Sequence, residues 1–250
     1  MRYNDVFLAD FSITFGEKTM MEHYTGFTPA TIEFLSQLRE NNTKEWFAER
    51  KPDYERLVKQ PSLSLIAVMN ERFEDLGVPF ISTPKASMFR IHRDTRFSKN
   101  KAPYKTNIGL FFPYIRRKTE NRPIEAPGLY IHIDSTEMFI GGGLYMPMPE
   151  QLRGIRERIS EEWKEFGNII THPIFLNEFP EGLRGERLQR VPRGFPSDHK
   201  AGELLKMKQY LVTCKLTEGQ VFTEQIIDII EAKSLALAPL LEYFVEAIEQ

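Results

Sequence analysis

Between residues 86 and 142 the sequence contains four short segments that predict β-strands, and this block restricts the chain to folds that combine a sheet with helices. The segments are rich in aromatic and β-branched residues, and loops containing Pro, Gly or charged residues separate them, as is typical of strands. They cover residues 86–93, 107–115, 128–134 and 137–142. A fifth strand is predicted at 209–216, and the polar, proline-containing stretch 116–127 predicts a surface loop.

Helical patterns occupy the chain before the strands. Thr28 and Pro29 are suited to begin a helix, and Thr43 to cap a second one in which Pro52 marks a bend or restart. A third helix is predicted at 62–76. The aromatic residues of the second helix are interpreted as core packing: Trp46, Phe47 and Tyr54.

Further helices are predicted after the strands, at 149–166, from about 199, and at 223–249 with an interruption at Pro239. Helices, then strands, then helices predict an α+β fold: a mostly antiparallel sheet flanked by N-terminal and C-terminal helices. Because no linker divides the organised part, we expect a single domain over residues 25–250, preceded by an N-terminal extension at 1–24.

Composition excludes several classes of protein. Lys and Arg total 33 against 35 for Asp and Glu, a net charge of −2, which argues against a wholly basic nucleic-acid-binding domain. Cys214 is the only cysteine, so an intrachain disulfide and a cysteine-based zinc site are excluded. No apolar stretch approaches the roughly 20 residues that cross a bilayer, and the first residues do not resemble a secretory signal. We therefore expect a cytoplasmic protein that is not embedded in a membrane.

One stretch, FRIHRDTRFSKNKAPYK at 89–105, concentrates positive charge in this slightly acidic chain. Arginine grips phosphate or carboxylate through two parallel hydrogen bonds, and lysine adds a compact charge. The stretch therefore predicts a site for a small anionic ligand. The segment RVPRGFPSDHK further along is a candidate for a second basic side of that site, with an ordinary surface loop as the alternative. The predicted ligand-binding residues are Arg90, Arg93, Asp94, Arg96, Lys101, Tyr104, Lys105, Arg190 and Arg193. Asp94 is expected to orient Arg90 or Arg93 as an ion pair.

Alternation along two strands predicts where the anion lies. In MFRIHRD, Phe89 and Ile91 are expected on the apolar face, with Arg90, His92 and Asp94 opposite. YIHID repeats the pattern, with Ile131 and Ile133 on one side and Tyr130, His132 and Asp134 on the other. If both strands belong to one sheet, the two polar faces converge.

His132 and Asp134 are the predicted catalytic residues. Histidine titrates near neutral pH, so His132 is a candidate general acid or base, oriented by Asp134. The alternatives are that this face is simply solvated and that His132 is tied into the hydrogen bonding of the sheet. Asp94 and Asp134 carry oxygen ligands suited to Mg²⁺, but neither strand has a recognised ligand signature, so no metal site is predicted. The sequence identifies no cofactor.

Three glycines at 141–143 have two interpretations. A tight turn with a positive φ is favoured over a backbone cradle for an oxyanion.

The chain resembles a widespread bacterial family of conserved hypothetical proteins, domain-of-unknown-function family 2461. The resemblance runs from about Gly26 to Phe244 and is carried by GFTPATIEFLSQLRENNTKEWF, FRIHRDTRFSKNKAPYKTNIG, GLYIHID, GGGLYMP, LQRVPRGF and LAPLLEYF. It implies a single domain and brings no established activity or catalytic residues. His92 departs from the aromatic residue expected there, and Asn100 from an aspartate, so His92 is left out of the predicted site.

Three functions remain open. The first is binding of, or catalysis on, a small phosphate- or carboxylate-bearing ligand at the basic site. The second is a nucleic-acid-binding module, in which the basic stretch follows a backbone and Phe97 or Tyr104 stacks on bases. The third is a structural or interaction protein whose basic cluster is paired with its own acids.

Overall fold

The computed structural model describes residues 24, 26–115 and 126–249. The predicted N-terminal extension and most of the predicted loop at 116–127 lie outside these ranges. The described part combines a four-stranded antiparallel sheet with helices, which confirms the predicted α+β fold. That residues 25–250 form a single domain stays a prediction. Among the described helices, none is both long enough and apolar enough to cross a membrane.

The sheet has the order β1-β2-β3-β4, so each strand pairs with its neighbour in sequence. The strands are β1 (Asn107–Pro113), β2 (Gly128–Asp134), β3 (Met138–Leu144) and β4 (Tyr210–Lys215). These ranges confirm the strands predicted at 107–115, 128–134, 137–142 and 209–216. Gly109 lies opposite His132, and Gly141 lies opposite Tyr130. The register therefore places a glycine beside each of these two polar side chains.

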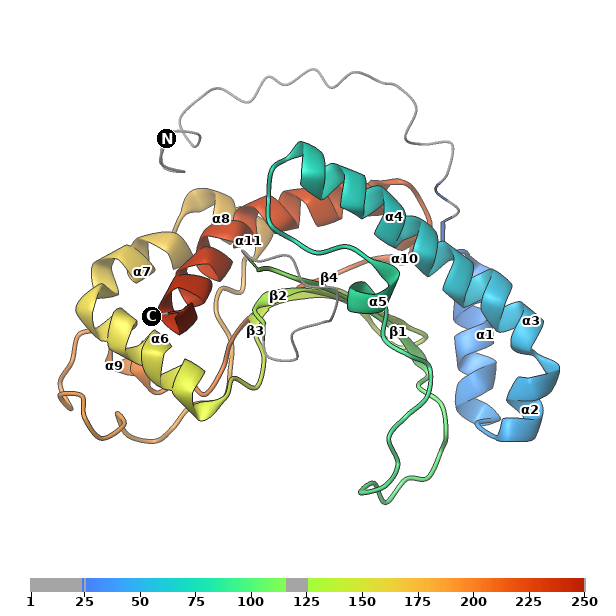
Figure 1. Cartoon of the computed structure of the whole chain (residues 1–250), viewed down its shortest axis with the longest axis horizontal. Helices are drawn as coiled ribbons and strands as arrows, with labels where there is room; N and C mark the ends of the chain where they lie inside the picture. Colours follow the sequence, from blue (N-terminus) through green and yellow to red (C-terminus); the bar gives the residue numbers. More distant parts are fainter. Residues whose placement is uncertain (1–23, 25, 116–125, 250) are drawn as a thin grey trace.

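Alternation along the strands gives the sheet two different faces. Leu110, Ile131, Ile140 and Val212 point into the core and are fully buried. Figure 1 shows α4 and α11 crossing this side of the sheet. The opposite side, called the open face below, carries half-buried side chains: Tyr130, His132, Phe139 and Thr213.

The helix α11 (Gln225–Glu249) is the main cover of the core face. Pro239 lies inside it, so the predicted interruption is wrong. Leu237, Leu240 and Leu241 on either side of Pro239 are fully buried, and this packing holds the helix together across the missing N–H. An ideal Cβ built at Gly142 would lie 2.1 Å from Leu237 Cδ2. Gly142 therefore allows the helix to approach the sheet closely. The predicted tight turn at 141–143 is replaced by strand β3, but the positive φ that the prediction required is present at Gly143, whose φ is 115°.

The N-terminal helices begin and end near the predicted positions, except that the second and third predicted helices run into one another through Pro61 without a break. They are α1 (Pro29–Glu40), α2 (Lys44–Glu49), α3 (Lys51–Tyr54), the π-helix η3 (Glu55–Lys59) and α4 (Gln60–Asp75). The Thr43 side chain accepts a hydrogen bond from Trp46 N and caps α2, and Pro52 stands in the first turn of α3 as predicted for a restart. Phe47 and Tyr54 are buried, which confirms their interpretation as core residues.

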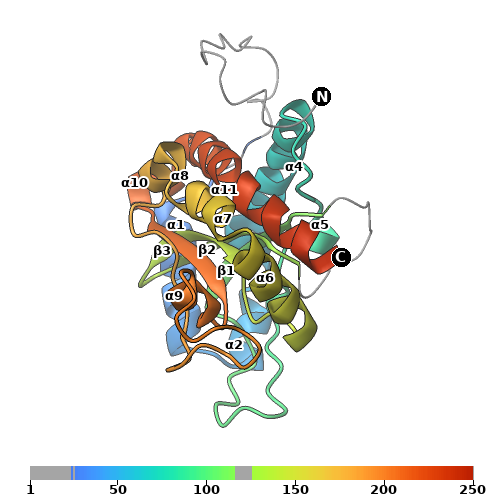
Figure 2. The ribbon, with the colours of Figure 1, turned by 90° about the vertical axis from the view of Figure 1, so that its left-hand side faces the viewer.

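The helices between β3 and β4 lie at the other end of the molecule from α1 to α3 (Figure 1), the end that faces the viewer in Figure 2. They are α6 (Pro149–Glu161), α7 (Trp163–Ile170), α8 (Pro173–Glu178) and α9 (Gly202–Leu205). The short helix α10 (Glu218–Val221) precedes α11. The single helix predicted at 149–166 is divided at Glu162, whose φ of −111° and ψ of 34° leave the helical region. The break turns the chain so that Phe166 packs against Tyr243, with ring centroids 5.0 Å apart.

Both edges of the sheet are flanked by irregular segments. Residues 88–93 flank β1 and the chain just before it, with bridges between Met88 and Leu110 of β1 and between His92 and Tyr104. The continuous strand predicted at 86–93 is wrong, because its first residues belong to the short helix α5 (Pro84–Ser87), which Thr83 caps. On the far edge, residues 184–188 pair with 206–211 through hydrogen bonds that include Arg184 N to Leu211 O at 2.6 Å.

Candidate functional site

A hydrogen-bonded chain of three side chains crosses the open face along β2. The hydroxyl of Tyr130 lies 3.1 Å from His132 Nδ1, and His132 Nε2 lies 3.3 Å from Asp134 Oδ2. The ring of His132 stacks on Phe139 of β3, with centroids 4.9 Å apart and planes inclined by 10°. The three residues alternate with buried isoleucines, so the strand geometry itself brings them together. The structure thus places the two predicted catalytic residues in contact and adds Tyr130.

The partners of His132 fix its neutral tautomer. Asp134 is an acceptor when ionised, so His132 Nε2–H donates to it. Nδ1 is then an acceptor and receives the Tyr130 hydroxyl, with Asn107 Nδ2 at 3.5 Å as a weaker second donor. In this arrangement the Tyr130 hydroxyl donates a hydrogen bond to His132 Nδ1.

Asp134 is held ionised by its surroundings. Burial alone would raise its pKa, but the backbone amides of Thr136 and Glu137, the Thr136 hydroxyl and His132 lower the pKa to about 2. Thr136 N lies 2.6 Å from Asp134 Oδ1, and Arg39 of α1 reaches Oδ2 at 3.1 Å. The carboxylate therefore anchors the turn between β2 and β3, orients His132 and ties α1 to the sheet.

Lys105 belongs to the open face, and Phe89 lies with it. An ideal Cβ at Gly109 would lie 3.0 Å from the Tyr130 hydroxyl and 3.1 Å from Phe89 Cδ2, so Phe89 covers the same side of the sheet as Tyr130. Lys105 Nζ lies 4.7 Å from the centre of the Phe89 ring. The prediction that Phe89 faces the apolar side is wrong, because the core side of this edge is filled by α5 and Met88.

The basic residues at 93–101 lie on a segment that extends away from the sheet between α5 and β1 (Figure 1). Asp94 pairs with Arg96 at 2.7 Å and not with Arg90 or Arg93 as predicted. These hydrogen bonds from Arg96 lower the pKa of Asp94 to about 2. Arg93 donates to Ala102 O, and Lys101 donates to Thr95 O. These three cations therefore stabilise the shape of their own loop.

Three other predicted ligand-binding residues are placed away from the open face. The ring of Tyr104 is buried and stacks on Phe47, with centroids 4.1 Å apart, so its predicted role as an exposed hydroxyl or stacking platform is wrong. Arg190 and Arg193 are exposed in the chain between α8 and α9, which follows the β4 edge. Residues 88–105 flank the β1 edge, so the two basic segments lie at opposite edges of the sheet.

Arg90 lines a cavity of about 450 Å³ between the helices α2, α3 and η3 and the segment Met88–His92. Lys51 and Lys59 also line it, and Glu55 is the one carboxylate that the described residues contribute. Glu55 pairs with Lys59 at 2.7 Å, which leaves an excess of positive charge. Phe47, Tyr54, Phe89 and His92 contribute aromatic walls. We call this space the basic cavity.

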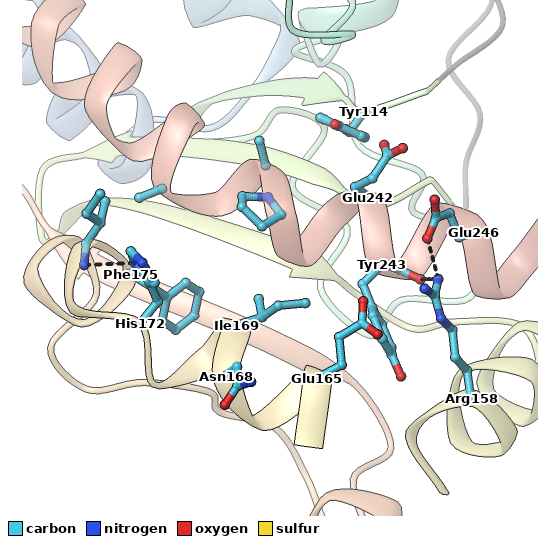
Figure 3. A pocket seen from close by; sticks show the side chains of 14 residues that line it. Tyr114, Arg158, Glu165, Asn168, Ile169, His172, Phe175, Glu242, Tyr243 and Glu246 are labelled. Carbon is cyan, nitrogen blue, oxygen red and sulfur yellow. Dashed lines mark hydrogen bonds and ion pairs between the residues drawn. The ribbon is translucent and has the colours of Figure 1, made fainter. Parts of the chain in front are cut away.

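A cavity of about 580 Å³ on the other side of the molecule has the opposite charge. Figure 3 shows its lining from α6, α7, α8 and α11. Glu165, Glu242 and Glu246 stand against a single arginine, Arg158, which lies 2.8 Å from Glu246. Arg158 also lies 4.0 Å from the centre of the Tyr243 ring. This cavity is unsuited to an anion, so the basic cavity is the better candidate.

A comparison with known protein families shows which family the chain resembles. The family described as "Conserved hypothetical protein (DUF2461)" matches residues 30–243. The chain belongs to the DUF2461 family. Searches of curated proteins and of solved structures found no match. The family description names no activity, so the function of this DUF2461 protein is argued from its site alone.

Sequence reasoning missed residues of this DUF2461 protein in two places, the basic cavity and the hydrogen-bonded chain on the open face. Lys51 and Lys59 stand on the second predicted helix, where nothing separates them from ordinary surface lysines. Arg39 lies 95 positions before its partner Asp134, so only the tertiary fold reveals the pair. Tyr130 was detectable, because it alternates with His132 on the predicted polar face. Within the described ranges, no three His, Cys, Asp or Glu side chains are grouped to hold a metal ion.

Proposed function

We propose that this protein binds a small anionic ligand in the basic cavity, with Arg90 as the principal anion-binding residue. The observation that carries the proposal is the charge of the cavity: among the residues that the structure describes, Lys51, Lys59 and Arg90 face a single carboxylate, Glu55. A planar guanidinium binds phosphate or carboxylate through two hydrogen bonds, and two lysines add charge from the opposite wall. The volume of about 450 Å³ is within the range of small-molecule sites.

Two further features support this location. The segment η3 is a π-helix, and such turns occur mostly as single-turn insertions, frequently at functional sites. Burial and the neighbouring Glu55 raise the pKa of Tyr54 to about 12, so its hydroxyl stays protonated beside the cavity. Aromatic walls with a cationic rim suit an anion that has an apolar or aromatic body.

The test is a thermal-shift and calorimetric screen of phosphate, citrate and nucleoside phosphates. Arg90→Ala is compared with Arg96→Ala, which removes an equal charge from the exposed loop. Hydrogen bonds to charged groups contribute about 1.5–3 kcal/mol, so Arg90→Ala is expected to weaken the best ligand about tenfold or more. Arg96→Ala is expected to bind like the wild type. Equal affinities for wild type and Arg90→Ala would refute the proposal.

An extension of the same screen distinguishes binding of a small anion from binding of nucleic acid. Single-stranded RNA and DNA are titrated at two salt concentrations, because backbone binding weakens steeply with salt in proportion to the phosphates contacted. A small ligand in the basic cavity is expected to show a shallow dependence. Tight, steeply salt-dependent binding of single strands that Arg96→Ala weakens and Arg90→Ala does not would favour the nucleic-acid-binding module.

A further inference from the structure

Residues 91–105, between α5 and β1, form a protruding arm, which we call the basic arm. Its two sides are joined by backbone hydrogen bonds: Arg93 N donates to Pro103 O at 2.9 Å, and Lys105 N donates to Ile91 O at 2.8 Å. The arm projects past α2 in both Figure 1 and Figure 2. It is therefore a paired structure that extends into the solvent.

The base of the basic arm is fixed to the turn between α1 and α2. The side chain of Asn42 donates to Tyr104 O and accepts from Tyr104 N, both at 3.0 Å. The buried ring of Tyr104 stacks on Phe47 of α2. Because these contacts already order the base, a partner that binds the arm loses little conformational freedom there.

The tip of the arm is a hydrogen-bonded turn that presents an aromatic ring. Ser98 N donates to Thr95 O at 3.3 Å, and Lys101 Nζ donates to the same oxygen at 2.9 Å. Phe97 lies within this turn and is 95% exposed, whereas the other exposed large apolar side chains of the described ranges reach at most 68%. The turn thus holds the Phe97 ring in the solvent, away from the core.

Positive charge surrounds this ring. Asp94 is the one carboxylate in residues 93–101, which contain four cations: Arg93, Arg96, Lys99 and Lys101. Asp94 pairs with Arg96, but in the part of the chain that the structure describes no carboxylate pairs with Lys99 or Lys101. The guanidinium carbon of Arg96 lies 5.8 Å from the centre of the Phe97 ring. The tip therefore combines an accessible aromatic face with an excess of positive charge.

We propose that the basic arm binds single-stranded nucleic acid, with Phe97 stacking on a base and Lys99 and Lys101 contacting the neighbouring phosphates. Proteins that bind single strands combine cations along the backbone with aromatic rings on which bases stack. A single strand fits because its unstacked bases are free to meet a protruding ring. The net charge of −2 does not oppose this, because salt screens charges more than about 10 Å from the tip.

An anionic membrane is a poorer partner for the same arm. Phe97 is the only apolar side chain in residues 94–101, whose sequence is DTRFSKNK. Binding at a membrane interface strengthens with the apolar area that is buried, and a single side chain buries little. Stacking on a base requires one ring face, which Phe97 provides.

This proposal goes beyond the binding of a small anion and uses other residues. The basic cavity is lined by Lys51, Lys59 and Arg90, none of which belongs to the tip. Small anions are therefore expected to depend on Arg90 and not on Phe97. Either proposal is able to fail while the other holds.

The experiment measures the affinity of the full chain for a fluorescein-labelled oligothymidine by fluorescence anisotropy. Stacking on an aromatic side chain contributes enough that Phe97→Ala is expected to weaken binding about fivefold or more. Phe97→Trp should bind like the wild type, whereas Phe97→Leu should bind like Phe97→Ala, because leucine is apolar but has no ring face. Tyr145→Ala is the matched control: Tyr145 is 65% exposed but lies after β3, so its loss should leave the affinity unchanged.

The salt dependence tests the role of the lysines. Each phosphate contacted on a single strand adds about 0.7 to the slope of log affinity against log salt, so Lys99→Gln should lower the slope by about that amount. Arg153→Gln removes a charge from an exposed arginine on α6 and should leave the slope unchanged. Equal slopes for wild type and Lys99→Gln would contradict the predicted phosphate contact.

The remaining outcomes decide between partners. If the wild type fails to bind oligothymidine at low salt, or if Phe97→Leu binds it as tightly as the wild type, the proposal is wrong. Cosedimentation with vesicles of phosphatidylserine and phosphatidylcholine is the parallel measurement. Vesicle binding that Phe97→Leu retains, with no binding of the oligonucleotide, would assign the arm to a membrane and overturn the proposal. Titrations of phosphate and citrate into Phe97→Ala show separately whether the basic cavity is intact.

Discussion

Replacing Asp134 with asparagine tests the electrostatic account of the open face. Asparagine has nearly the shape of a protonated aspartate, so the variant removes the charge and leaves the size unchanged. Its amide would present hydrogen-bond donors toward His132 Nε2–H and Arg39, which donate to the carboxylate in the wild type. We therefore expect Asp134→Asn to lower the free energy of unfolding.

The magnitude follows from the pKa of Asp134. That pKa is lowered from 3.8 to about 2, a shift of just under two units. One unit corresponds to about 1.36 kcal/mol, so the ionised carboxylate stabilises the folded state by about 2 kcal/mol. Because the folded pKa lies below the unfolded one, this stabilisation is complete above about pH 4. It is lost as the pH falls through the folded pKa of about 2.

The assay is urea unfolding followed by tryptophan fluorescence at pH values from 7 down to 2.5. At pH 7 the variant is expected to unfold with about 2 kcal/mol less free energy than the wild type, and the gap should narrow as the pH approaches 2. Asp94→Asn is the matched control, since its ion-pair partner Arg96 lies two residues away on the same exposed loop, where solvent screens the pair. Its urea midpoint should equal that of the wild type. The reasoning would be refuted if wild type and Asp134→Asn had the same free energy of unfolding at pH 7, or if their difference stayed constant down to pH 2.5.

Two further predictions concern packing and buried charge. Gly142→Ala should lower the free energy of unfolding by about 1–3 kcal/mol in urea titrations, because the added methyl group would collide with Leu237. Gly141→Ala should lower it less, since the nearest contact of an added methyl group there is 3.3 Å away. Equal losses for the two variants would contradict the packing argument. Glu178→Ala should cost about 3 kcal/mol, since it leaves the ammonium of Lys233, only 7% exposed, without its carboxylate at 2.8 Å. The double variant Glu178→Ala/Lys233→Met should recover most of that loss, and failure to recover would contradict the charge argument.

The regular elements were predictable because their patterns are local. Thr43 and Pro52 mark helix starts through capping and a fixed φ, and both act as expected in the structure. The strands at 107–115 and 128–134 are short runs rich in aromatic and β-branched residues between loops, and 128–134 also alternates, which is a direct consequence of backbone geometry. The interruption predicted at Pro239 was wrong because the local effect of proline competes with the packing of the leucines on either side, and the packing prevails.

The face of residues 88–93 was not predictable from alternation. A period of two says which side chains share a face but not which face meets the core, and a shift of one residue exchanges the two. Here α5 and Met88 fill the core side, so Phe89 lies on the open face beside Tyr130 and Arg90 lines the basic cavity. Of the predicted ligand-binding residues, Arg90 lines the basic cavity, and the prediction joined it to His132, from which the sheet edge separates it.

The irregular segments along β1 and β4 affect how this protein can associate with itself. A bare strand edge presents unsatisfied amides and carbonyls that recruit a strand from another molecule. Here Met88 and Phe89 pair with β1, and Arg184 pairs with Leu211 of β4, and both flanking segments are short and carry charges such as Arg93 and Glu186. Continuous cross-molecular sheets, and the fibrils that grow from them, are disfavoured.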